Sequence, residues 1–194
     1  GLEEVEPLDA PGFVLPFGDG PAPIYRERIG KNVFLNIIYA ATKYVYITTP
    51  YLIITDEMKS ALVLAKKRRV DVRIITPGIP DKKLIYKVTR SYYAGLAMNG
   101  VRIYEYTPGF VHAKQCVVDG ELALCGTINL DYRSLYHSFE DGVLFYGCDA
   151  VGAVKQDFDE LFGVCEEVTE RYRSGRNTAL RISQCILRLL SPLL

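Results

Sequence analysis

The sequence predicts an α/β fold in which a mixed, mostly parallel β-sheet is sandwiched between helices. Short segments rich in β-branched and aromatic residues alternate with longer segments whose apolar residues recur at helical spacing. This alternation is typical of parallel strands that are covered by helices. The chain has 194 residues, of which 49% are hydrophobic, and this provides for one core and favours a single domain.

The chain begins with residues 1–23, which are rich in Gly and Pro and carry no sustained period, so we expect an irregular linker there. In the segment 26–41, apolar residues recur three and four positions apart, which predicts a helix. The segment 44–49 (YVYITT) stops at a proline and suits a buried strand. Asp56 is expected to cap a helix that ends near residue 69, where basic residues complement the helix dipole.

The middle of the chain continues this alternation. Residues 70–76 (VDVRIIT) predict a short apolar strand, residues 81–99 a helix that ends at a glycine, and residues 101–106 (VRIYEY) a further strand. Together with the strand expected at 44–49, these segments predict the parallel part of the sheet.

The following segments bring other strands into the sheet. Strands are expected at 112–118 and 122–125, joined by the dipeptide Asp119-Gly120, which is a tight-turn signal. A further strand at 138–146 precedes a helix at 150–171. The sheet is therefore predicted to become mixed in this part of the chain.

The last segment, 176–194, is predicted to be an amphipathic helix that follows the folded domain at 24–175. Its leucines and isoleucines stand against several arginines, as in helices whose apolar side enters lipid while Arg meets anionic headgroups. A helix packed on its own domain is the alternative. The sequence contains no run of about twenty apolar residues, so we expect a chain that is soluble or at most bound to a membrane surface.

The charge balance argues against a general attraction to polyanions. The 23 acidic and 23 basic residues cancel, so no nucleic-acid partner is expected. The five cysteines form no C-x-x-C pair, which suits reduced, buried thiols in a cytosolic setting. We expect neither a metal nor a cofactor.

The stretch from His112 to Glu140 combines the side chains that a phosphodiester reaction needs. The imidazole of His112 can attack phosphorus as the neutral base or protonate a leaving oxygen as the cation. Lys114 offers a positive charge and Asn129 an amide donor to phosphoryl oxygens. Glu140 is the candidate carboxylate for holding the second ring nitrogen of His112. If 112–118 is a strand, His112 and Lys114 share one face with Cys116.

Other residues in or near this stretch have alternative interpretations. Turn chemistry alone favours Asp119 before a glycine. Cys116 and Cys125 flank the motif and could join His112 in a metal site, but nothing provides a fourth ligand at metal spacing. No partner pattern surrounds His137, so we expect it to be structural.

The pattern H-x-K-x4-D that starts at His112, followed by G-T-x-N and a Glu, resembles the second half of the phospholipase D superfamily. The flanking segments look like bacterial cardiolipin synthase, and the resemblance covers roughly residues 22 to 194. It extends over Thr49-Pro-Tyr-Leu52, residues 70–77, Arg90-Ser-Tyr-Tyr93, and the stretch from YEYTPGFVHAK to GTINLDYRSLYHSFE.

This resemblance implies a phospholipid transphosphatidylase that requires no metal. In proteins of this family, two such motifs face each other across a pseudo-twofold axis. The histidine of one motif attacks phosphorus to give a phosphohistidine, and the histidine of the other is the general acid and base. The phosphatidyl group then passes to a second phosphatidylglycerol, and glycerol is released. Carried over to this chain, the resemblance implies an acid-base role for His112, phosphate binding by Lys114, Thr127 and Asn129, orientation of His112 by Glu140, and a structural role for Asp119.

The chain departs from this pattern because it holds two histidines and His137 is not followed by a lysine two positions on. We therefore expect the first motif and the membrane-spanning N-terminus of the family to be missing, which leaves an isolated C-terminal half with weak or no activity alone. Its expected partners are phosphatidylglycerol, the missing half or a second copy in a homodimer, and a membrane surface. A full-length member would act at the cytoplasmic face of the cell membrane.

Arg90 and Tyr92 are possible headgroup-binding residues, and the wet face of a helix is the alternative for them. Two other functions compete with phosphatidyl transfer. A phosphodiesterase or nuclease of the phospholipase D type would use the same core chemistry, although the neutral net charge counts against it. A catalytically incomplete lipid-headgroup-binding module is the third possibility.

Overall fold

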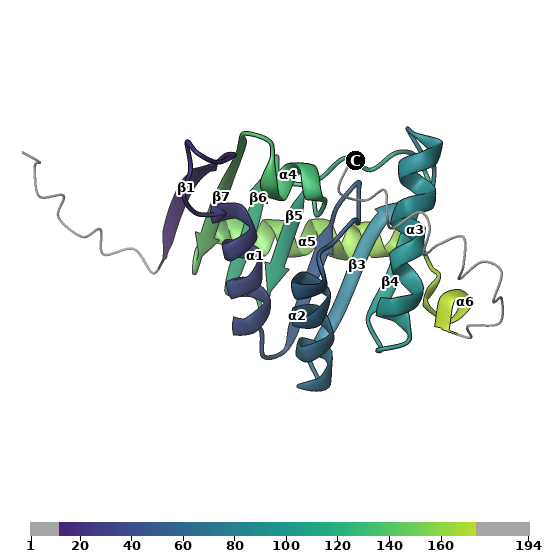
Figure 1. The fold of residues 1–194 in the computed structure, drawn as a ribbon. Helices are drawn as coiled ribbons and strands as arrows, with labels where there is room; N and C mark the ends of the chain where they lie inside the picture. The colour runs from purple at the N-terminus through teal and green to yellow at the C-terminus, as the bar shows by residue number, and fades with distance from the viewer. Residues whose placement is uncertain (1–11, 174–194) are drawn as a thin grey trace, which may run out of the picture.

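Helices cover both faces of an eight-stranded sheet in the computed structural model, which describes residues 12–173 (Figure 1). The strands are β1 (Phe13–Asp19), β2 (Tyr44–Thr48), β3 (Asp71–Pro77), β4 (Arg102–Tyr106), β5 (Gln115–Val118), β6 (Leu122–Gly126), β7 (Glu140–Tyr146) and β8 (Cys165–Glu167). The helices are α1 (Ile29–Ala40), α2 (Asp56–Lys67), α3 (Lys83–Ala97), α4 (Tyr132–Tyr136), α5 (Asp149–Val164) and α6 (Thr169–Arg173). The predicted α/β class, with a mixed sheet between helices, is confirmed.

The sheet has the strand order β1-β7-β6-β5-β2-β3-β4-β8. Only the β2–β3 and β3–β4 pairings are parallel within residues 12–173, and the other five pairings are antiparallel. The prediction of a mostly parallel sheet was therefore wrong. Strands β5, β6 and β7 follow one another as antiparallel neighbours, and β1 and β8 close the two edges in antiparallel pairings.

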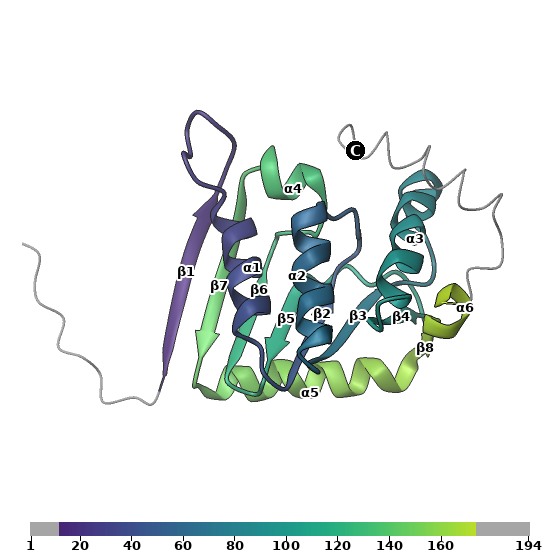
Figure 2. The same ribbon diagram turned by 60° about the horizontal axis from the view of Figure 1, so that its bottom comes forward.

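Two apolar layers attach the helices to the sheet. On one face, α1, α2 and α3 pack over a large core that includes Ile38, Leu62 and Leu96. On the other face, α5 crosses the strands (Figure 2) and presses Phe158 against aromatic and β-branched side chains such as Tyr46. Because both faces are covered, the central strands are buried on both sides, as their unbroken apolar segments suggested.

Several predicted boundaries change for identifiable reasons. The expected linker 1–23 contains β1, an edge strand whose pairing with β7 supplies the order that its Gly and Pro content did not suggest. The N-cap of α2 is Thr55, whose Oγ1 accepts a hydrogen bond from the Met58 amide, so Asp56 is the first helical residue. The helix expected at 150–171 stops at Val164, because the next residues pair with β4 as β8.

Other predictions lie outside the described residues. They are the irregular state of residues 1–11 and the whole of the amphipathic helix at 176–194, whose binding to a membrane surface stays a prediction. Within residues 12–173, none of the helices has the length and apolar character needed to span a bilayer.

One edge of the sheet collects the ends of strands that carry the predicted site. The parallel strands β2, β3 and β4 end there, and antiparallel pairing brings the start of β5 beside the end of β2, where Thr48 pairs with Gln115. The end of β6 and the start of β7 meet at the same edge, where Gly126 pairs with Gly142. Ligand sites in open α/β sheets are found outside the carboxyl ends of such strands.

Candidate active site

His112 and Lys114 lie in the irregular segment that enters β5, and not on the strand itself. The prediction that they share a strand face with Cys116 was therefore wrong. The His112 side chain is exposed, and Lys114 is half-buried with its Nζ donating a 2.7 Å hydrogen bond to the His112 carbonyl oxygen. This contact folds the lysine back over the loop, so that the cation stays beside the imidazole.

The G-T-x-N loop is fastened to the end of β2. Ile53 donates its amide to the Leu130 carbonyl at 2.8 Å, and the Leu130 amide donates to Thr49 Oγ1 at 3.1 Å. The Thr49 hydroxyl in turn donates to the Tyr51 carbonyl at 2.8 Å. These contacts between segments about eighty positions apart hold Asn129 at the same edge as His112.

Glu140 contacts Thr127 and not His112. The Thr127 hydroxyl donates a short hydrogen bond to Glu140 Oε2 and accepts one of 2.9 Å from the Asp141 amide. No hydrogen bond joins Glu140 to His112 in the part of the chain that the structure describes, so the predicted orienting contact is not formed. A carboxylate whose charge raises the pKa of His112 is that of Asp81.

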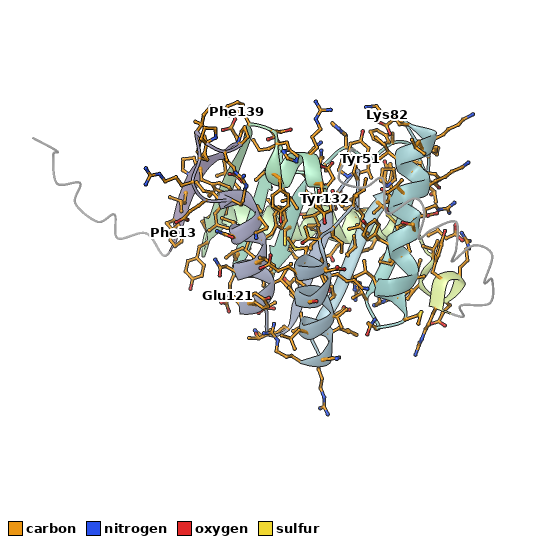
Figure 3. All side chains as sticks on the ribbon, viewed as in Figure 1. Phe13, Tyr51, Lys82, Glu121, Tyr132 and Phe139 are labelled. Atoms are coloured by element: carbon orange, nitrogen blue, oxygen red, sulfur yellow. The ribbon has the colours of Figure 1, made fainter. Side chains whose placement is uncertain are left out.

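A cavity of about 250 Å³ opens beside this loop and includes Asn129 and Glu140 in its wall. Asn129 Oδ1 is buried in the structure without a hydrogen-bond partner. Tyr51 and Lys82 come together near the N-terminal end of α3 (Figure 3). The wall consists of Tyr51, Ile53, Lys82, Ile85, Asn129, Asp131, Arg133, Ser134, Ser138 and Glu140.

The charges around the imidazole favour its neutral form. Partial burial and the positive charge of Lys114 lower the pKa of His112 below 6.5, and Asp81 opposes this shift. Burial likewise lowers the pKa of Lys114, against the pull of Glu140 and Asp131. Burial raises the pKa of the Asp131 carboxyl, and hydrogen bonding with Ser134 and Asn129 opposes the rise. The edge thus combines an imidazole whose pKa is lowered with a cation held among carboxylates.

These charges predict opposite shifts in two variants. Lys114→Met removes a positive charge, so the pKa of His112 is expected to rise towards 6.5, whereas Asp81→Asn is expected to lower it further. NMR titration of the His112 ring protons measures both shifts. Shifts of the same sign in the two variants would contradict this arrangement of charges.

Asp119 lies at the far end of β5, away from His112. Its carboxylate accepts four hydrogen bonds from the entrance to β2, from the Thr42 amide and hydroxyl at 2.7 Å each, the Lys43 amide at 2.8 Å and the Tyr44 amide at 2.7 Å. Figure 3 shows the neighbouring Glu121 at the opposite end of the molecule from Lys82. Asp119 therefore ties two strands together, as a scaffold residue would.

Arg90 and Tyr92 lie apart from the cavity wall. The Arg90 guanidinium forms a two-pronged ion pair with Glu105, at 2.8 and 2.9 Å, and stacks over the Tyr86 ring. Tyr92 is 9% exposed and belongs to the apolar core. Headgroup binding by these two residues stays a prediction, and the geometry favours structural roles for both.

Arg90→Met is expected to destabilise the fold by about 3 kcal/mol, because Glu105 is 4% exposed and would be left as an unpaired buried charge. Adding Glu105→Gln should recover part of this loss. Chemical denaturation measures both effects, with the exposed Lys87→Met as control. Wild-type stability for Arg90→Met would contradict the structural role.

The metal interpretation of the cysteines finds no support in the geometry. Cys116 is fully buried, and burial raises the pKa of its thiol, which disfavours the thiolate that a metal needs. Between residues 12 and 173, no three His, Cys, Asp or Glu side chains lie together in a way that could hold a metal ion.

Six polar residues of the cavity wall received no role from the sequence, namely Tyr51, Lys82, Asp131, Arg133, Ser134 and Ser138. All of them except Lys82 stand in the segments TPYL and GTINLDYRSLYHSFE, which carried the resemblance. Lys82 precedes α3, and no local sequence pattern indicates that it lines the cavity, because its position depends on how β3 and α3 meet the sheet edge.

Comparison with known proteins shows the family of the chain. Residues 34–162 match the family model described as "Cardiolipin synthase, PLD-like domain". A cardiolipin synthase of Halalkalibacterium halodurans is 38% identical over 174 residues, which are 89% of this chain and 34% of that protein. An uncharacterized Streptococcus mutans protein is 44% identical over 95% of this chain and 40% of its own length. The chain therefore spans two fifths or less of these relatives.

Solved structures show the same fold at low sequence identity. A phosphatidylserine synthase of Haemophilus influenzae has a TM-score of 0.70 at 16% identity and is matched over 94% of this chain and 48% of its own. Nuc, a phospholipase D family member of Salmonella typhimurium, has a TM-score of 0.66 at 18% identity, over 80% of this chain and 97% of its own. From the matched family model and the identity over most of this chain together, the chain belongs to the family of phospholipase D-like domains of cardiolipin synthases.

Proposed function

We propose that this chain supplies one half of the active site of a cardiolipin synthase, the half that carries the second motif. The observation that carries this proposal is the meeting at one sheet edge of an exposed imidazole, its neighbour Lys114, and the G-T-x-N loop that is fastened to β2. A phosphodiester needs such a combination of proton transfer and charge neutralisation. The substrate is phosphatidylglycerol or a related phospholipid.

In the proposed reaction, a histidine of the other half attacks the phosphorus of one phosphatidylglycerol. The phosphorus–oxygen bond to glycerol breaks, and His112 gives its proton to the departing oxygen. The neutral His112 then takes the proton from the hydroxyl of a second phosphatidylglycerol while that oxygen attacks the phosphohistidine. The phosphorus–nitrogen bond breaks, and cardiolipin leaves with His112 protonated again. The lowered pKa of His112 favours the neutral form required for the second step.

Lys114, Thr127 and Asn129 are the proposed phosphate ligands. Lys114 would contribute charge, and Thr127 and Asn129 would contribute hydrogen bonds once substrate displaces the present Thr127–Glu140 contact. Glu140, released from Thr127, could then turn towards His112. A complete site also requires a second histidine, from a preceding half or from a second copy of the chain. We propose that the assembled enzyme acts at the cytoplasmic face of the membrane.

A chimera tests the proposal, with this chain replacing the segment that it matches in the Halalkalibacterium halodurans cardiolipin synthase. We expect the chimera to convert phosphatidylglycerol in vesicles to cardiolipin and free glycerol, and this chain alone to be weak or inactive. Single- and double-stranded DNA serve as competing substrates. A folded chimera that forms no cardiolipin but cleaves DNA would replace the proposal with a nuclease function, and one that cleaves neither would leave a headgroup-binding module.

A further inference from the structure

The cavity beside the proposed site has two basic side chains for which no ion pair is formed within residues 12–173. Lys82 and Arg133 both line it, and both are exposed, yet the ion pairs of the described residues involve other cations. They come from different elements, because Lys82 precedes α3 and Arg133 lies in α4. Two free cations in one cavity wall suit an anion with several oxygens.

The rest of the wall suits hydroxyl groups. Ser138 offers a hydroxyl, and the carboxylates of Asp131 and Glu140, which also accept hydrogen bonds from Ser134 and Thr127, have a second oxygen each that can accept from a polyol. The same carboxylates would repel a phosphate, so a phosphate is confined to the part of the wall that carries the cations. The cavity thus matches a ligand that joins a glycerol to a phosphate.

We propose that this cavity binds the headgroup of the acceptor lipid, with Lys82 and Arg133 holding the acceptor phosphate that does not react. This inference rests on the proposed function, and it assigns residues that the H-x-K-x4-D motif does not contain. Because Asn129 and Glu140 belong to both the cavity wall and the reactive edge, a glycerol in the cavity can present its free hydroxyl to the phosphohistidine.

The consequence concerns which acceptor takes the phosphatidyl group. In the transfer step, the acceptor oxygen forms a bond to phosphorus, the phosphorus–nitrogen bond of the phosphohistidine breaks, and the acceptor proton goes to His112. Water can complete the same step and gives phosphatidic acid in place of cardiolipin. Water carries no phosphate, so Lys82 and Arg133 favour the lipid acceptor over hydrolysis.

Binding to this chain tests the cavity independently of catalysis. Glycerol 3-phosphate, glycerol and inorganic phosphate are titrated separately into isotope-labelled protein, and amide NMR shifts are followed at Ser134 and Ser138. We expect glycerol 3-phosphate to bind more tightly than either fragment. The double variant Lys82→Gln, Arg133→Gln should weaken its binding about tenfold, as expected for two exposed charge pairs. The double variant Lys83→Gln, Arg26→Gln has the same net charge, lies outside the wall and should bind as wild type.

Two results would overturn the proposal. One is equal affinity for inorganic phosphate and glycerol 3-phosphate, which would describe a plain anion site. The other is equal weakening in the two double variants, which would reduce the effect to net charge. A failure of the proposed function would show differently, as a chimera that does not make cardiolipin although the chain binds glycerol 3-phosphate.

Product analysis in the chimera gives the second test. The ratio of cardiolipin to phosphatidic acid is expected to fall about tenfold in the double variant Lys82→Gln, Arg133→Gln. The reason is that the affinity for the lipid acceptor falls about tenfold while the reaction with water is unchanged. It should keep its wild-type value in Lys83→Gln, Arg26→Gln. A ratio that is unchanged in the cavity variant would contradict acceptor selection by these two residues.

Discussion

Replacing His112 by Ala in the chimera is expected to lower cardiolipin formation about 10²- to 10⁴-fold, the usual contribution of a general acid and base. The loss should appear in the turnover rate, because the imidazole moves protons and Lys114 remains to neutralise phosphate. Since His112 is exposed, its removal should leave the free energy of unfolding within about 0.5 kcal/mol of wild type. Lipid phosphorus analysis of the products measures the rate.

His137→Ala provides the matched control, because His137 is the other histidine of the chain and is also exposed. It lies just after α4, and its expected role is structural, so we expect activity close to wild type. Equal activity in His112→Ala and wild type would remove His112 from the mechanism. Equal losses in both variants would indicate a general effect of changing this edge.

Asp119→Ala is expected to destabilise the fold by about 3 kcal/mol. The change removes the acceptor of four hydrogen bonds, and charged acceptors contribute more than neutral ones. It also places Ala at a φ of 56°, where Asp is tolerated better. Chemical denaturation measures the loss. Glu121→Ala, on the same turn but exposed, should change the free energy of unfolding by less than about 0.5 kcal/mol.

The pH dependence of stability identifies the charge of Asp119 as the cause. Its four donors outweigh partial burial and lower its pKa in the folded state below 3.8. A lowered pKa stabilises the fold fully above about pH 4, and this contribution is lost as the pH falls through the folded-state pKa. The difference in stability between wild type and Asp119→Asn should therefore shrink on acidification. A constant difference from pH 6 to the acid limit would contradict this origin.

The fold class could be predicted because its signals are local. Segments such as 44–49 and 70–76 are β-branched and apolar for a reason that holds in the structure, since β2 and β3 are covered on both faces. The direction of the strands is set by tertiary pairing, which no local signal encodes. For this reason β1 was missed in a segment rich in Gly and Pro, and the parallel part of the sheet was overestimated.

In the candidate site, too, the residues could be predicted from the sequence but their tertiary contacts could not. His112, Lys114, Asn129 and Glu140 could be named as candidates from their spacing in the sequence, and the structure places them beside the ends of β5, β6 and β7. The contacts of these residues could not be predicted from the sequence. Glu140 accepts a hydrogen bond from Thr127, and the pKa of His112 responds to the charge of Asp81, which lies thirty-one positions earlier. The pair Arg90–Glu105 likewise links a helix to a neighbouring strand, and neither residue signals this alone.

The central claim is that this chain contributes half of a composite site, and reconstitution measures it most directly. The chain is mixed with the remaining part of the Halalkalibacterium halodurans enzyme, their association is measured by light scattering, and cardiolipin formation is compared with that of each part alone. We predict that the associated mixture forms cardiolipin and that neither part does so at a comparable rate. An associated mixture without activity, or this chain alone working as fast as the mixture, would contradict the claim.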